Sequence, residues 1–169
     1  MTYPTFKEVE IGGPKTLQQY RQMLDTAGCR IESHVEEMLL PRIQFMREPR
    51  QIALARISVM QLGFNNSACM TSICKRVLTF GSPIRLIPAE ACLALRLAYM
   101  DQPDRELLKM GMRPITYKSD SPSCAVDVVY QILTMVRDGK TLWIGEAEGY
   151  PDIEWPPDAE FVFMKRSLN

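Results

Sequence analysis

The apolar and polar positions near the N-terminus predict a strand followed by a helix. Residues 6–11 alternate apolar with charged side chains, a period of two that is typical of a half-buried strand, and Gly12-Gly13-Pro14 ends it. Thr16 is a suitable N-cap for a helix over about 17–27, and Gly28 supplies the stop. The inward stripe of this helix comprises Leu17, Tyr20, Leu24 and Ala27.

A second helix is expected after Gly28. Ser33 and Glu36 have the spacing of a capping box, and Pro41 ends the pattern. Its inward positions are Val35, Met38 and Leu39. The two helices would form a helical hairpin, and the stretch 41–50, which carries Arg42, Arg47 and Arg50, is interpreted as a connector.

The middle of the chain predicts two strands around a third helix. Residues 52–60 fit either a strand or a helix turn, and their β-branched side chains favour the strand. A helix over about 68–80 ends at Gly81. The short strand 84–87 is cut by Pro88.

The C-terminal part of the pattern is dominated by strands. Residues 128–136 form the strongest strand pattern in the chain, and Asp138-Gly139 predicts a hairpin to 141–144. An acidic loop over 146–160 then leads to a last strand at 161–164. These short connections favour an antiparallel meander.

The expected fold is therefore a single α+β domain over 1–169, with a helical part over about 1–50 and a sheet-rich part over about 51–169. An N-terminal helical pair and a third helix would pack on an antiparallel sheet of about five strands. At 169 residues, such a domain buries roughly 70% of the surface of its unfolded chain.

Residues 86–115 leave one alternative open. If 89–100 is a strand, Arg96 lies on the face opposite Tyr99, and a turn at 102–104 returns the chain into 107–112 as a hairpin. If it is a helix, Glu90 lies in the first turn, where the helix dipole favours a carboxylate. The buried stripe would then be Leu93, Leu97 and Met100. We favour the hairpin.

Charge is balanced overall but unevenly spread. Residues 1–60 hold 8 basic and 7 acidic side chains, residues 61–118 hold 8 and 4, and residues 119–169 hold 4 and 9. A chain with zero net charge lacks the basic footprint of nucleic-acid binding, so no nucleic-acid partner is expected. The opposite charges of the middle and last thirds would face each other within the fold, across a dimer, or toward a partner.

Five cysteines without a CxxC pair predict buried thiols and no metal site. The N-terminus has no signal-peptide order, and no apolar run approaches the length of a membrane span. We therefore expect a cytoplasmic protein with no membrane association.

The expected ligand-binding candidates lie in two groups. Glu90, Arg96, Tyr99 and Gln102 would offer a carboxylate, a guanidinium, a phenol and an amide to a small polar molecule. Alternatively, Arg96 pairs with Glu90 or Glu106 and these groups are structural. The second group comprises Trp143 and Trp155, which flank the acidic loop and would line a pocket mouth or close a core edge.

Catalytic patterns are weak. His34 is the only histidine, and beside Ser33 it is interpreted as an exposed helix-start residue rather than a general base. Gly12-Gly13-Pro14 lacks the lysine and spacing of a phosphate loop. The acidic loop 146–160 lacks the ligand spacing of a calcium loop. No catalytic residue, metal or cofactor is expected.

Several short motifs resemble a family of small bacterial proteins from environmental and candidate-phylum genomes, over roughly residues 7–166. They are Leu62-Gly63-Phe64, Ile73-Cys74, Pro88-Ala89-Glu90, Leu95-Arg96-Leu97 with Tyr99, Asp101-Gln102-Pro103, Pro114-Ile115 and Phe161-Val162-Phe163. The chain departs from this family at Cys92-Leu93, where the family has Gly-Pro. The resemblance implies a coherent domain and, because the family has no assigned activity, no chemistry.

The sequence thus predicts a non-enzymatic module that binds a small molecule or a protein and assembles as a homo-oligomer such as a homodimer. One alternative is a small hydrolase-like enzyme with Glu90 as acid or base, Arg96 as anion stabiliser and Tyr99 as orienting group. The other alternative is a toxin–antitoxin-type component that acts through protein contacts.

Overall fold

The computed structural model describes residues 3–13, 16–119 and 128–166. Its helical elements are α1 (Leu17–Thr26), the π-helical turn η1 (Val35–Leu39), the 3₁₀ turn η2 (Leu40–Arg42), α2 (Met70–Leu78) and α3 (Glu90–Ala98). Its strands are β1 (Lys7–Ile11), β2 (Cys29–Ile31), β3 (Arg50–Ser58), β4 (Ala68–Cys69), β5 (Ile84–Arg85), β6 (Leu107–Met110), β7 (Ile115–Lys118), β8 (Val128–Asp138), β9 (Thr141–Glu148), β10 (Glu154–Trp155) and β11 (Glu160–Lys165). Among the described helices, none has the length and apolar character needed to span a membrane.

The main sheet of the described chain has nine strands and is mixed. Seven follow the order β1-β3-β11-β6-β8-β9-β2, while β5 joins β11 and β7 joins β8. The pairs β11–β6 and β2–β9 are parallel, and the other ladders are antiparallel. The prediction of a helical pair on a five-stranded antiparallel sheet is therefore wrong. Ladders between distant segments, which no local pattern specifies, decide the architecture.

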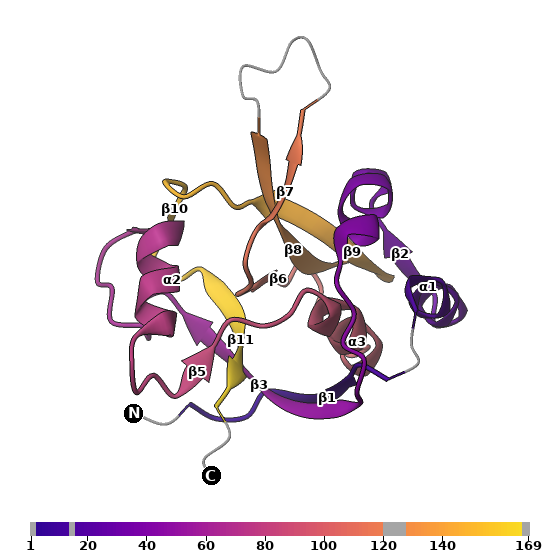
Figure 1. Cartoon of the computed structure of the whole chain (residues 1–169), viewed down its shortest axis with the longest axis horizontal. Coiled ribbons are helices and arrows are strands. Elements are labelled where there is room, and N and C mark those ends of the chain that lie inside the picture. The colour runs from indigo at the N-terminus through magenta and orange to yellow at the C-terminus, as the bar shows by residue number, and fades with distance from the viewer. Residues whose placement is uncertain (1–2, 14–15, 120–127, 167–169) are drawn as a thin grey trace.

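The sheet curls around α3 into a half-barrel (Figure 1). Helix α3 contacts β1 at one end of the strand order and β8 and β9 near the other end, so the sheet must bend to reach it. Helix α1 packs against α3 from outside this curl, and α2 lies on the opposite side of the molecule, near β4 and β5 (Figure 1). The core consequently lies between α3 and the concave face.

The expected helical hairpin is absent from the described N-terminal segments, and this prediction is corrected. After α1 the chain forms β2, which pairs in parallel with β9, and only then turns through η1 and η2. Residues 33–42 are helical where the second helix is predicted, and Val35 and Leu39 are buried as expected. The predicted capping bonds are not found among the described residues, and the Glu36 carboxylate instead forms an ion pair with Arg21 of α1, 2.5 Å away. Pairing of residues 29–31 with a strand more than 100 residues away places a strand between the two helical segments, so they do not form a hairpin.

The stretch 89–100 is a helix, so the favoured hairpin was wrong. Residues 90–96 are all buried, because α3 is enclosed by strands on one side and α1 on another. A helix enclosed in this way needs no single apolar stripe, which is why the alternation around Arg96 resembled a strand. Of the three positions expected in the helical stripe, Leu93 is fully buried and Met100 is 40% exposed.

Other local predictions are confirmed. The strand at 6–11 corresponds to β1, and α1 begins with a complete capping box between Thr16 and Gln19. The ambiguous stretch 52–60 is a strand, and the hairpin at Asp138-Gly139 joins β8 to β9 with the expected antiparallel register. These elements have caps, turns or periods within a few residues, so local chemistry suffices to specify them.

Candidate functional site

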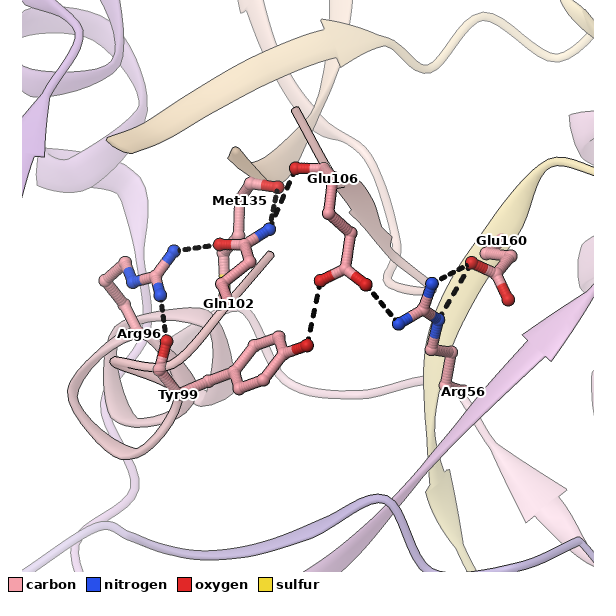
Figure 2. Close-up of polar contacts among 7 residues, drawn as sticks. All are labelled: Arg56, Arg96, Tyr99, Gln102, Glu106, Met135 and Glu160. Carbon is pink, nitrogen blue, oxygen red and sulfur yellow. Dashed lines mark hydrogen bonds and ion pairs between the residues drawn. The ribbon is translucent and has the colours of Figure 1, made fainter. Parts of the chain in front are cut away.

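The sequence-predicted residues Arg96, Tyr99 and Gln102 come together, and all three are buried (Figure 2). The Arg96 guanidinium donates to the side-chain oxygen of Gln102 and to the backbone carbonyl of Tyr99. The Gln102 amide nitrogen donates to the backbone carbonyls of Glu106 and Met135, at 2.9 and 3.2 Å. This cluster joins the end of α3 to β8 and to the residues just before β6.

A second chain of polar groups continues from Tyr99 across the sheet (Figure 2). The Tyr99 hydroxyl donates to Glu106, 2.9 Å away, and Glu106 also pairs with Arg56 of β3. Arg56 in turn pairs with Glu160 of β11. Burial and the Glu106 carboxylate raise the pKa of Tyr99 to about 12, while burial lowers the pKa of Arg96. Both carboxylates pair with Arg56, whereas the fully buried Arg96 is held by neutral oxygens of Gln102 and Tyr99.

Glu90 lies apart from these groups, at the first turn of α3. Its carboxylate accepts hydrogen bonds from the backbone N–H of Gly12 at 2.7 Å, the backbone N–H of Met46 at 2.9 Å and the hydroxyl of Tyr20 at 3.1 Å. Burial, followed by the Glu90 charge, raises the pKa of Tyr20. Arg96 lies six positions after Glu90 in α3, which corresponds to a rise of about 9 Å and about one and two-thirds turns. The structure does not bring these two side chains together.

The two tryptophans lie on separate sheets, because β10 pairs with β4 in a second, two-stranded sheet apart from the main one. Trp143 is half-buried on β9, opposite Val136 of β8. Trp155 of β10 packs edge-on against Phe161, with ring centres 5.6 Å apart, and the Lys109 ammonium lies 5.1 Å from its ring centre. Trp155 therefore closes a core edge, and neither tryptophan contacts the Glu90 or Arg96 groups through a described hydrogen bond or ring contact.

His34 joins three distant segments. Its Nδ1 lies 2.6 Å from a carboxylate oxygen of Glu146, and its Nε2 lies 3.0 Å from the hydroxyl of Tyr117. Its side chain is 47% exposed, as expected for a residue at a helix start. With Glu146 accepting from Nδ1–H, Nε2 would accept the Tyr117 proton. These hydrogen bonds link the start of η1 to β9 and β7 and hold η1 and η2 against the sheet.

A cleft of about 860 Å³ lies between residues 42–50, the segment 86–89 and residues 112–116, which falls in the size range of small-molecule sites. Apolar side chains such as Phe45, Ile87 and Met112 line it. Phe45 stacks on Tyr20, with ring centres 5.8 Å apart, and the Met46 N–H donates to Glu90. Glu90 and Tyr20 thus contact Met46 and Phe45, and these contacts support one wall of the cleft from the protein interior.

The charged side chains of the cleft are all arginines. Arg42, Arg50 and Arg113 line it, and no aspartate or glutamate is found among its described lining residues. Arg42 lies 5.3 Å from the ring centre of Tyr117 and donates to the Met38 carbonyl. Arg50 and Arg113 are exposed and form no side-chain hydrogen bond or ion pair with the described residues. Their charges are therefore available to a ligand.

A smaller cleft beside α1 and β2 has both basic and acidic side chains in its lining, in contrast to the first cleft. It has a volume of about 370 Å³ and is lined by Arg21 and Arg30, but also by Asp25, Glu36 and Glu37. Arg21 is paired there with Glu36. Its three carboxylates outnumber its two arginines, so this cleft offers no net attraction to an anion.

Sequence reasoning missed the arginine cleft although one signal was present. Three arginines occur within 42–50, which was interpreted only as a connector, and Arg113 lies more than 60 residues further along the chain. Only the fold brings these segments to one cleft. In the acidic loop, part of 146–160 is taken up by β9 and β10, and no group of three or more histidine, cysteine, aspartate or glutamate side chains is placed to hold a metal ion among the described residues.

Comparisons with known proteins give no function for these sites. No family model matches the chain, and neither does any curated protein or solved structure.

Proposed function

We propose that this protein is a binding module that takes a small anionic molecule in the cleft formed by residues 42–50, 86–89 and 112–116. The observation that carries the proposal is the set of Arg42, Arg50 and Arg113 around a cleft with no described acidic lining residue. In a chain with equal numbers of basic and acidic side chains, such a separation creates a local positive potential. Guanidinium groups bind phosphate and carboxylate oxygens through paired N–H donors.

The apolar part of the cleft narrows the class of ligand. Phe45, Ile87 and Met112 line the same cleft as the arginines, so a ligand with an apolar or planar body and an anionic group would satisfy both surfaces. Inorganic anions would engage the arginines alone and bind more weakly.

The hydrolase-like alternative receives less support from the geometry. It requires Glu90 and Arg96 to act on one substrate within hydrogen-bond reach. Both side chains are fully buried, and they lie on different faces of α3, where each hydrogen-bonds to protein groups. A binding role for the arginine cleft needs no such rearrangement.

Isothermal titration calorimetry with inorganic pyrophosphate tests the proposal. We expect saturable binding that weakens about tenfold or more in Arg50→Gln and in Arg113→Gln, since a charged hydrogen bond contributes roughly 1.5–3 kcal/mol. Arg30→Gln is the matched control, because Arg30 is exposed on β2 in the smaller cleft, where the lining carboxylates outnumber the arginines. Absence of pyrophosphate binding, or equal weakening in all three variants, would rule out the cleft as an anion site.

A further inference from the structure

A second cleft adjoins the first. It has a volume of about 500 Å³, lies between the end of α2, β5 and the end of β11, and shares Leu86, Arg113 and Met164 with the first cleft. Figure 1 shows β5 beside β11 with α2 next to them, so these walls come from neighbouring elements. The two clefts form one extended path across the surface, which we call the arginine groove.

The second cleft repeats the charge pattern of the first. Arg85, Arg113 and Arg166 line it, and again no acidic side chain is found among its described lining residues. Arg85 and Arg166 are exposed and form no side-chain hydrogen bond or ion pair with the described residues. The arginine groove therefore carries five arginines, of which only Arg42 has described side-chain contacts. This is more positive charge than a ligand with one anionic group would neutralise.

An exposed aromatic ring lines the same cleft as these arginines. Phe80 lines the second cleft and is 100% exposed, whereas the other phenylalanines with described side chains are buried or half-buried. This exposed ring is a ready stacking surface for a planar group. Arginines that follow a path, together with an aromatic platform, are the combination that binds single-stranded nucleic acids without reading sequence.

We infer that the arginine groove binds a short single-stranded nucleic acid, with phosphates at the arginines and a base stacked on Phe80. This inference rests on the proposed anion binding in the first cleft and extends it to a polymer that spans both clefts. A flexible strand carries one negative charge per nucleotide, so its phosphates can reach arginines that are spread along the groove. A single small anion cannot reach all of them.

The neutral net charge of the whole chain predicts no nucleic-acid partner. The positive charge within the arginine groove instead favours one. The excess of acidic residues belongs to the last third of the chain, and none of its described members lines either cleft. At physiological salt, screening limits interactions between exposed charges to about 8 Å. The acidic residues of the last third of the chain, which line neither cleft, therefore affect the potential in the groove less than its own arginines do.

Fluorescence anisotropy with a labelled eight-nucleotide oligo(dT) tests the inference. We expect binding that is lost at high salt, with log K falling about 0.7 per log salt for each phosphate contact. Arg85→Gln and Arg166→Gln should each weaken oligo(dT) binding about fivefold or more, lower this salt slope, and leave pyrophosphate binding in the first cleft unchanged. Phe80→Ala should weaken oligo(dT) binding about tenfold with an unchanged salt slope, since stacking carries no charge.

The controls are Arg30→Gln and Met60→Ala, which alter an exposed arginine and an exposed apolar side chain outside both clefts. Two results would overturn the nucleic-acid inference and leave the small-anion site standing. In the first, pyrophosphate binds but oligo(dT) does not. In the second, oligo(dT) binds to Arg85→Gln, Arg166→Gln and Phe80→Ala as tightly as to the unaltered protein. If pyrophosphate fails to bind, the proposed function itself fails. Circular dichroism confirms that each variant is folded.

Discussion

The carboxylate of Glu90 accepts a hydrogen bond from the backbone N–H of Gly12, 2.7 Å away across 78 residues of sequence. This bond ties the first turn of α3 to the end of β1, and the same carboxylate holds Met46 in the wall of the arginine-lined cleft. A residue first considered as a ligand-binding candidate thereby gains a clear supporting role. Its negative charge is directed toward three protein donors rather than into the cleft.

Replacing Glu90 with glutamine should destabilise the fold by about 2–4 kcal/mol. The neutral amide accepts more weakly than a carboxylate, and its NH2 group would face a backbone donor that needs an acceptor. Urea denaturation at pH 7 measures the loss. Glu37→Gln is the control, since Glu37 is exposed, and a change within about 0.5 kcal/mol is expected there. Equal stability of the two variants would contradict the role assigned to Glu90.

Gly12→Ala should be far more destabilising than Gly28→Ala, although both glycines have positive φ, at +79° and +72°. A Cβ at Gly12 would lie 2.1 Å from the carbonyl oxygen of Glu48, whereas none of the described heavy atoms lies within 4 Å of a Cβ at Gly28. Gly28→Ala should cost about 1–2 kcal/mol from the backbone alone. Thermal unfolding of both variants separates the two effects, and similar melting temperatures would show that the contact at Gly12 relaxes without cost.

The stability of the protein should fall between about pH 10 and pH 12 because of Tyr99. Its pKa is about 12 in the folded chain and about 10 in the unfolded chain, so folding favours the neutral phenol. This contribution is complete below pH 10 and is lost as the pH rises through 12. Tyr99→Phe should reduce the slope of unfolding free energy against pH in this window, measured by urea denaturation. An unchanged slope would contradict the raised pKa.

Cysteine reactivity should differ sharply between two thiols. The Ser72 hydroxyl lies 3.2 Å from the Cys69 sulfur, and this hydrogen bond lowers the pKa of Cys69. Burial raises the pKa of Cys92 to about 12. Iodoacetamide at pH 8, followed by peptide mapping, should modify Cys69 in the folded protein and Cys92 only after denaturation. Ser72→Ala should slow the labelling of Cys69, and an unchanged rate would show that the hydrogen bond does not control the thiolate.

The elements that sequence predicted well are those with local signals. The Thr16 N-cap and the Asp138-Gly139 turn each act within a few residues, so α1 and the β8–β9 hairpin were identified correctly. The short strand β2 was missed because three residues carry no usable period, and its identity depends on pairing with β9. The ambiguity at 89–100 arose because a helix buried on all sides has no polar face to display its period.

The candidate site was less predictable than the fold. Arg50 and Arg113 are ordinary charged positions in the sequence, and their importance comes from lining one cleft that has no described acidic lining residue. Arg96 was conspicuous because a charge lies within an apolar run, and the structure gives it buried partners in Gln102 and Tyr99. Ligand binding by Glu90, Arg96, Tyr99, Gln102, Trp143 and Trp155 stays a prediction.

The sequence by itself determined the strands and helices whose caps, turns and periods are local, and the overall balance of charge. Tertiary structure alone decided the mixed order of the sheet, its curl around α3, and the meeting of Arg42, Arg50 and Arg113 at one cleft. The physical reason is the range of the interactions. Backbone hydrogen bonds within a turn depend on neighbouring residues, whereas strand pairing and local potential depend on segments far apart in the chain.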